Sequence, residues 1–188
     1  MGIERVGVVG GGQMGGGVAE LTGKAGLPTV VREVSPEAAE RSRAGIQKSL
    51  DRALERGKLD EAAHDEAQGN LTFTTEIGDL ADCDLVVEAV VESFDLKAEV
   101  FRALDEVVTS PDAVLATNTS SIPIIDIAMT TGRPEKVLGL HFFNPAPVMK
   151  LVEVIPSVRT DEEVTAMVTA FATDVLDKVV VAAKDRAG

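Results

Sequence analysis

Short apolar runs alternate with segments of helical periodicity along the chain. Runs rich in Val, Ile and Leu predict strands at 4–9, 28–34, 71–74, 85–90, 114–117, 137–141, 149–155 and 179–182. Apolar residues at helical spacing predict helices at 13–25, 36–56, 59–69, 96–108, 124–129 and 161–176. Strands that alternate with helices predict parallel βαβ units, and hence an α/β fold with a doubly wound, mostly parallel sheet.

The two helices within residues 36–70 are the longest departure from this alternation. Ser35 and Pro36 supply an N-cap and a favourable first residue, and Gly57 separates the two helices. We expect the pair to protrude from the sheet as a helical arm. The length of 188 residues fits one domain, spanning residues 1–188.

Composition narrows the class of protein. The chain is 45% apolar and 26% charged, which is typical of a soluble globular protein, and it lacks a membrane-length apolar run. The N-terminus has no signal-peptide pattern and Cys83 is the single cysteine, so we expect a cytoplasmic protein with a buried, reduced thiol. A net charge of −13 argues against nucleic acid or an anionic membrane as main partner. Two histidines and one cysteine, widely spaced, do not predict a zinc site.

A glycine-rich turn follows the first predicted strand. Gly10, Gly12 and Gly15 form the pattern G-x-G-x-x-G and open a helix. These glycines permit a tight turn, close approach of the backbone to a pyrophosphate, and close packing of helix on strand. The anion would bind at the positive end of the helix dipole. The pattern therefore predicts a Rossmann-type dinucleotide site.

Glu33 ends the second predicted strand, 18 residues after Gly15. A carboxylate at this position binds the hydroxyls of the adenine ribose and repels a 2′-phosphate, so we expect NAD rather than NADP. Arg32 should point away from the ribose, because side chains alternate along a strand. The simpler alternative is a glycine-rich turn beside a solvated glutamate.

A carboxylate also interrupts a later apolar strand, where Glu153 lies within LVEVI, twelve residues after His141. Histidine, with an ordinary pKa of about 6.5, can accept the proton that an alcohol loses during hydride transfer. A nearby carboxylate would hold the ring and stabilise the imidazolium. The simpler alternative is a core histidine and a glutamate on an edge strand. We expect His64, within the polar segment EAAHDEA, to lie on the surface.

Three blocks carry a resemblance to a known family. They are DLVVEAVVE at 84–92, NTSSIP at 118–123 and GLHFFNPAPVMKLVEVI at 139–155. They closely resemble the short-chain L-3-hydroxyacyl-CoA dehydrogenases, including 3-hydroxybutyryl-CoA dehydrogenases, and the likeness covers essentially the whole chain. The resemblance implies NAD-dependent oxidation of an L-3-hydroxyacyl-CoA, or the reverse reduction of a substrate such as acetoacetyl-CoA, in fatty acid or butanoate metabolism.

The resemblance also implies roles for individual residues. It makes His141 the catalytic base, Glu153 its partner, and Ser120 and Asn144 contacts of the substrate. The implied cofactor contacts are Gly10, Gly12, Gln13, Met14, Gly15, Glu33, Glu92, Lys97, Ser120 and Asn144. The loop is richer in glycine than usual, and Glu33 stands where an aspartate is common.

Coenzyme A is the third implied ligand, through Ser49, Arg56 and Ser120, with Arg56 at a position that is often lysine. Four basic residues lie at helical spacing on one face of the arm helix, and such a basic face suits the phosphates of the CoA that the resemblance implies: Arg41, Lys48, Arg52 and Arg56. The simpler alternative is a solvated face with ion pairs such as Glu37–Arg41.

The resemblance implies that the family continues past the position of Gly188 into a helical C-terminal domain, so we expect the given sequence to be the dinucleotide-binding part without that domain. By resemblance, that domain carries the dimer interface and a further active-site asparagine, so the full-length protein is expected to be a homodimer. Two alternatives remain open. One is a related NAD-dependent hydroxy-acid dehydrogenase acting on sugar acids, and the other is a catalytically silent NAD-binding module.

Overall fold

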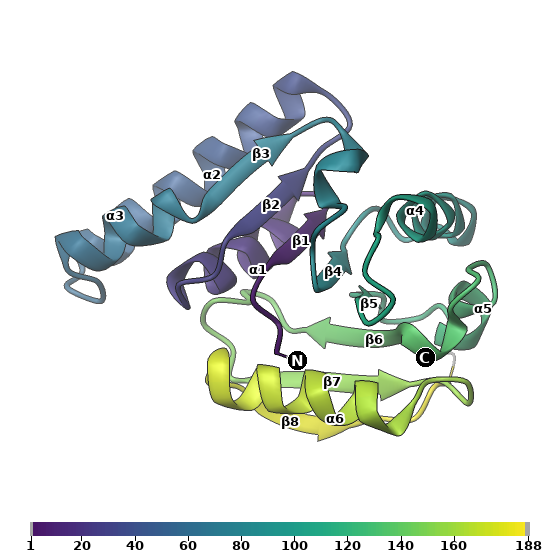
Figure 1. Cartoon of the computed structure of the whole chain (residues 1–188). Coiled ribbons are helices and arrows are strands. Elements are labelled where there is room, and N and C mark those ends of the chain that lie inside the picture. The colour runs from purple at the N-terminus through teal and green to yellow at the C-terminus, as the bar shows by residue number, and fades with distance from the viewer. Residues whose placement is uncertain (1, 187–188) are drawn as a thin grey trace.

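The computed structural model of the protein describes residues 2–186 (Figure 1). Met1, Ala187 and Gly188, at the two ends of the predicted domain, lie outside the described residues. The strands are β1 Val6–Val9, β2 Thr29–Arg32, β3 Leu71–Thr74, β4 Leu85–Glu88, β5 Val114–Thr117, β6 Val137–Phe142, β7 Leu151–Pro156 and β8 Val179–Ala182. Each coincides with a predicted strand to within a few residues.

The strands form one sheet in the order β3-β2-β1-β4-β5-β6-β7-β8. The first six are mutually parallel, β7 is antiparallel to β6, and β8 is parallel to β7. The reversal at β7 follows from its connection, because the segment between β6 and β7 contains no helix and is too short for a crossover. The predicted mostly parallel, doubly wound sheet is confirmed.

Helices cover both faces of the sheet. They are α1 Gln13–Lys24, α2 Pro36–Glu55, α3 Glu61–Gly69, α4 Phe94–Val107, α5 Ile124–Ala128 and α6 Glu162–Ala170. A π-helical turn, Phe171–Val175, extends α6, and two short 3₁₀ helices, Ile77–Leu80 and Pro134–Lys136, were not predicted. The periodicity of the sequence thus located every α-helix, and its misses are single turns.

The core divides into two layers because side chains alternate across the strands. Val8 and Val87 belong to the layer that α1, α2, α3 and α6 cover. Val86 and Leu115 belong to the layer beneath α4 and α5, together with the buried Cys83. Cys83 is buried as predicted, and burial raises the pKa of its thiol to about 11.

The helical arm is anchored along one face. The Ser35 hydroxyl caps α2 by accepting a hydrogen bond from the Ala38 amide at 3.2 Å, and Ile46 and Leu50 are buried. A helix of 20 residues is about 30 Å long, whereas a four-residue strand spans only about 13 Å. The arm therefore extends past the strands that it covers, as Figure 1 shows for α2 and α3.

The prediction for His64 is wrong, because this residue is buried between the two arm helices. It is 8% exposed, and Nε2 lies 2.9 Å from the Asp51 carboxylate of α2 and 2.9 Å from the Gln68 amide. The hydrogen bonds with Asp51 and Asp65 raise the pKa of His64 despite the opposing effect of burial. The histidine links α2 to α3 and has no place in the predicted site.

Candidate active site

The glycine-rich turn connects β1 to α1 at the carboxyl edge of the sheet. Gly10 has φ +89°, a conformation that side chains strongly disfavour. A Cβ on Gly15 would lie 1.8 Å from the Gly10 carbonyl oxygen, so α1 contacts the turn through its glycine. Gly12 caps α1 without a side-chain hydrogen bond, and a Cβ there would meet no heavy atom within 4 Å. The first turn of α1 therefore offers open space and helix-terminal N–H groups to an anion.

Glu33 faces this turn from the end of β2. Its Oε1 accepts a hydrogen bond from the Gly11 amide at 2.7 Å. Arg32 points elsewhere, with Nε donating to the Thr75 carbonyl oxygen at 3.2 Å. The turn and the carboxylate together fit a dinucleotide, since one accommodates a pyrophosphate and the other accepts hydrogen bonds from a ribose. Gln13 and Met14 form the start of α1 beside this space.

His141 and Glu153 are paired residues of the antiparallel strands β6 and β7. His141 Nδ1 lies 2.8 Å from Glu153 Oε2. Val152 and Val154 point into the opposite core layer, which explains how a carboxylate fits within an apolar strand. Because an ionised carboxylate only accepts, a neutral imidazole in this pair carries its proton on Nδ1, and within residues 2–186 nothing hydrogen-bonds to Nε2. The Phe143 ring packs against the imidazole at a centroid distance of 4.9 Å.

Two predicted contacts of the substrate lie in loops next to this pair. Ser120 is exposed after β5, and Asn144 is exposed after β6. Within residues 2–186 neither side chain hydrogen-bonds to His141. The neighbouring Asn118 holds the two strand ends together, since its Oδ1 accepts a hydrogen bond from the Phe142 amide at 2.9 Å. The loops are thus fixed at the edge where His141 lies.

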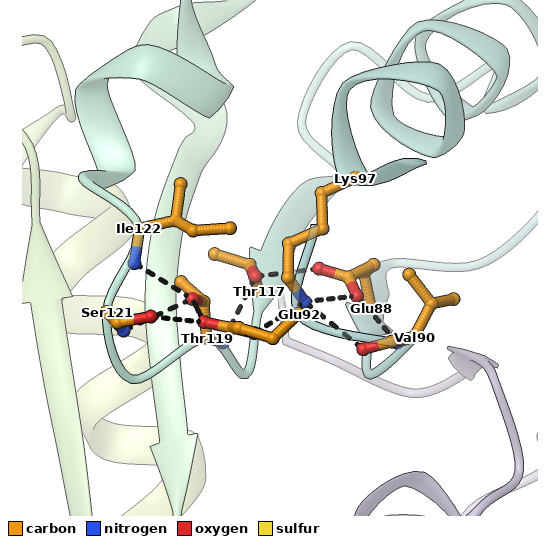
Figure 2. Close-up of polar contacts among 8 residues, drawn as sticks. All are labelled: Glu88, Val90, Glu92, Lys97, Thr117, Thr119, Ser121 and Ile122. Atoms are coloured by element: carbon orange, nitrogen blue, oxygen red, sulfur yellow. Dashed lines mark hydrogen bonds and ion pairs between the residues drawn. The ribbon is translucent and has the colours of Figure 1, made fainter. Parts of the chain in front are cut away.

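The other two predicted cofactor residues belong to a network of charges (Figure 2). Lys97 of α4 is 1% exposed, and its Nζ lies 3.3 Å from Glu92 Oε2 and 2.8 Å from Glu88 Oε1. The hydroxyls of Thr119 and Ser121 donate to Glu92 Oε1. Glu88 was missed in the sequence, although it ends the apolar run Leu85–Val87 and a carboxylate in such a run is the same signal that identified Glu153.

A groove of about 1050 Å³ runs from the glycine-rich turn along α2 to the loop 144–148. Ser49 and Arg56, the predicted CoA contacts, both line it. The charged residues along it are Lys24, Glu20, Glu33, Arg41, Arg52, Arg56 and Lys58. Lys48 was predicted on this face but does not line the groove, and Lys24 and Lys58 were missed. His141 and Glu153 lie outside its lining, although Asn144 belongs to it.

Two further searches covered only the part of the chain that the structure describes. None of its helices is both long and apolar enough to cross a membrane. Over the same residues, no three His, Cys, Asp or Glu side chains gather in a way that could hold a metal ion.

Comparison with known proteins gives consistent matches. A family model described as "3-hydroxyacyl-CoA dehydrogenase, NAD binding domain" matches residues 5–186. The 3-hydroxybutyryl-CoA dehydrogenase of Mycobacterium tuberculosis is 53% identical over 186 residues, which are 99% of this chain and 65% of that protein. The crystal structure of M. tuberculosis FadB2 superposes with a TM-score of 0.98 at 52% identity, covering 100% of this chain and 66% of that one. The crystal structure of Escherichia coli 3-hydroxybutyryl-CoA dehydrogenase superposes with a TM-score of 0.94 at 39% identity. The match covers 98% of this chain and 39% of that one.

The chain spans about 65% of the length of the M. tuberculosis 3-hydroxybutyryl-CoA dehydrogenase. The match includes the glycine-rich turn, β2 and the Glu33 that follows it, and the cofactor is NAD. This chain belongs to the family of 3-hydroxyacyl-CoA dehydrogenase NAD-binding domains.

Proposed function

We propose that this chain is the cofactor-binding part of an NAD-dependent L-3-hydroxyacyl-CoA dehydrogenase. The observation that carries the proposal is the hydrogen bond of 2.8 Å between His141 Nδ1 and Glu153 Oε2, at the sheet edge that holds the dinucleotide turn. Relatives named 3-hydroxybutyryl-CoA dehydrogenase support it. Bound NAD would supply the hydride acceptor for oxidation of an alcohol, or NADH the donor for the reverse reduction.

In the proposed reaction His141 moves the proton. Its free Nε2 accepts the proton of the 3-hydroxyl group, while Nδ1–H stays hydrogen-bonded to Glu153. The carboxylate holds the ring in one tautomer and stabilises the imidazolium that forms. Ser120 and Asn144 orient the reacting oxygen and the thioester from their loops, with Asn144 and the first turn of α1 also facing the cofactor.

The basic groove is the proposed site for coenzyme A. Ser49 and Arg56 line it, and Arg41 and Arg52 add positive charge along the same face of α2. This charge stands out in a protein of net charge −13 and suits the phosphates of CoA. The end of the groove at the glycine-rich turn belongs to the proposed NAD site, and a free hydroxy acid would leave the basic part along α2 unused, which favours a CoA ester over a sugar acid. The full-length enzyme is proposed to be a homodimer, through a C-terminal domain like that of the family.

A substrate comparison tests the proposal. NADH oxidation is followed with acetoacetyl-CoA, with longer 3-ketoacyl-CoA esters and with free acetoacetate. The 188-residue chain is assayed alone and extended by the C-terminal third of the M. tuberculosis relative. We expect turnover of the CoA esters and far slower turnover of the free acid. Equal rates with acetoacetate would point to a hydroxy-acid dehydrogenase, and NADH binding without turnover in either form would point to a silent module.

A further inference from the structure

A buried carboxylate that the proposed reaction does not use ends β4. Glu88 is 0% exposed, and each of its oxygens accepts hydrogen bonds. Oε1 accepts from Lys97 Nζ at 2.8 Å and from the Val90 amide at 2.6 Å. Oε2 accepts from the Thr117 hydroxyl at 2.7 Å. Figure 2 shows Lys97 reaching down from α4 between Glu88 and Glu92.

Stability is a weak explanation for this ion pair. Removing two charges from water is costly, and well-packed apolar residues are often as stable in the same place or more so. Val9, the partner of Glu88 on β1, is apolar and equally buried. The sheet therefore does not require a charge at this level, and the pair points to another role.

The position of Glu88 links three loops of the cofactor site. Its register partners are Val9, just before the glycine-rich turn, and Thr117, just before the loop that contains Ser120. The Asn118 amide also donates to the Glu88 carbonyl oxygen at 2.9 Å. Glu88 thus lies directly beneath the edge where NAD binds in this family.

Lys97 can act on a ligand only through a neighbour. Its ammonium is shared among Glu88 Oε1 at 2.8 Å, Glu92 Oε2 at 3.3 Å and the Val90 carbonyl oxygen at 3.4 Å. Its side chain is 1% exposed, whereas that of Glu92 is 42% exposed. Of the three charged side chains, Glu92 is therefore the one that a bound molecule can reach, and Lys97 fixes it from below.

The network keeps Glu92 ionised. Burial raises the pKa of this carboxyl, but the hydrogen bonds from Thr119 and Ser121 and the charge of Lys97 outweigh that effect, and its pKa is lowered. Two carboxylates share one ammonium, so a negative charge remains and is accessible at Glu92. A fixed anionic acceptor of this kind suits the hydroxyl and amide donors of NAD.

We propose that Glu88 is a positioning residue for NAD, whose buried carboxylate holds the Lys97 ammonium and thereby fixes the Glu92 carboxylate at the mouth of the cofactor site. The inference rests on the proposed function and on the role predicted from the sequence for Glu92 as a cofactor contact. It goes further by assigning the buried pair a function in cofactor affinity.

The test compares Glu88→Gln, Lys97→Met and the double variant in the 188-residue chain. Glu99→Gln is the matched control, because Glu99 is exposed on the same helix as Lys97. For each protein, unfolding in urea gives the midpoint of the transition, and a separate fluorescence titration of the folded protein gives the affinity for NADH. Each single variant leaves an unpaired or poorly paired buried group, so its urea midpoint should fall. The double variant removes both charges, so its midpoint should recover most of the loss.

NADH affinity separates positioning from stability. We expect a weakening on the order of 10-fold in both single variants, the loss typical of one hydrogen bond to a charged group, and no recovery in the double variant. The control should match the unmodified chain in both measurements. The proposal would be overturned if NADH affinity recovered in the double variant together with the urea midpoint. An unchanged NADH affinity in Glu88→Gln would overturn it as well. Neither readout requires acyl-CoA turnover, so failure here is distinct from failure of the proposed reaction.

Discussion

The close contact between α1 and the glycine-rich turn makes a sharp prediction for Gly15→Ala. An added Cβ would lie 1.8 Å from the Gly10 carbonyl oxygen and 3.0 Å from its carbon. Both neighbours are backbone atoms of a residue at φ +89°, so no side chain can rotate away. Relief requires α1 to move off β1, which would disturb the turn and the core contact with Val8, whose Cγ1 lies 3.1 Å from the same Cβ.

The size of the clash sets the expected loss of stability. The Cβ would fall short of ordinary van der Waals contact, which begins at 3.4 Å, by about 1.6 Å. Overpacking a core typically costs about 1–3 kcal/mol, and a clash between backbone groups belongs at or above the upper end. In a domain of this size, about 3 kcal/mol lowers Tm by roughly 6–12 °C. NADH affinity should fall as well, because the anion site moves with α1.

Two other Gly→Ala variants serve as controls for Gly15→Ala. A Cβ on Gly45 or on Gly12 would meet no heavy atom within 4 Å. Gly45 lies within α2, so Gly45→Ala should raise stability by up to about 1 kcal/mol. Gly12→Ala should cost at most about 1 kcal/mol as a helix cap, yet weaken NADH binding by narrowing the anion site. Thermal unfolding and NADH titration give both quantities. Equal Tm values for Gly15→Ala and Gly45→Ala would refute the packing argument.

Three further predictions concern charged groups. The chain should bind NADH more tightly than NADPH, and Glu33→Gln should weaken NADH binding by about 10-fold and reduce the preference for NADH over NADPH. A preference for NADPH in titrations of the unmodified chain would contradict the role of Glu33. The pKa of His64 is raised, so its hydrogen bonds to Asp51 and Asp65 stabilise the fold fully below about pH 6.5 and less as pH rises through the raised pKa. His64→Gln should therefore lower the urea midpoint more at about pH 5.5 than at about pH 9. In the extended enzyme Arg56→Ala should raise KM for acetoacetyl-CoA by about 10-fold with little change in kcat, whereas Lys48→Ala, outside the groove, should leave KM unchanged in the same steady-state assay.

The sequence predicted the sheet well because its central strands β1, β4 and β5 are fully buried and rich in Val and Leu. Such runs have clear limits in the sequence, since Val6–Val9 lies between Arg5 and Gly10, and the apolar part of β4 lies between Asp84 and Glu88. The direction of β7 depends on its short connection to β6, and it was not assigned from the apolar pattern. That antiparallel register is what places Glu153 directly opposite His141.

Predictions failed where burial depends on contacts between distant segments. His64 lies in a polar stretch, and only its position against Asp51 of α2 shows that it is buried. Glu88 has the same kind of signal as Glu153, a carboxylate within an apolar strand, but its partner Lys97 comes from the next helix and Thr117 from the next strand. Periodicity reports which face a residue occupies, and it does not report which charges meet on that face.

The central claim is that His141, held by Glu153, moves the proton in a reaction for which this chain binds NAD. The most direct test is the rate of NADH oxidation by acetoacetyl-CoA in the extended enzyme, measured for His141→Gln and Glu153→Gln alongside NADH affinity. We expect His141→Gln to lower kcat by on the order of 10²–10⁴, and Glu153→Gln to lower it by less, with NADH affinity unchanged in both. An unchanged kcat in His141→Gln would contradict the claim.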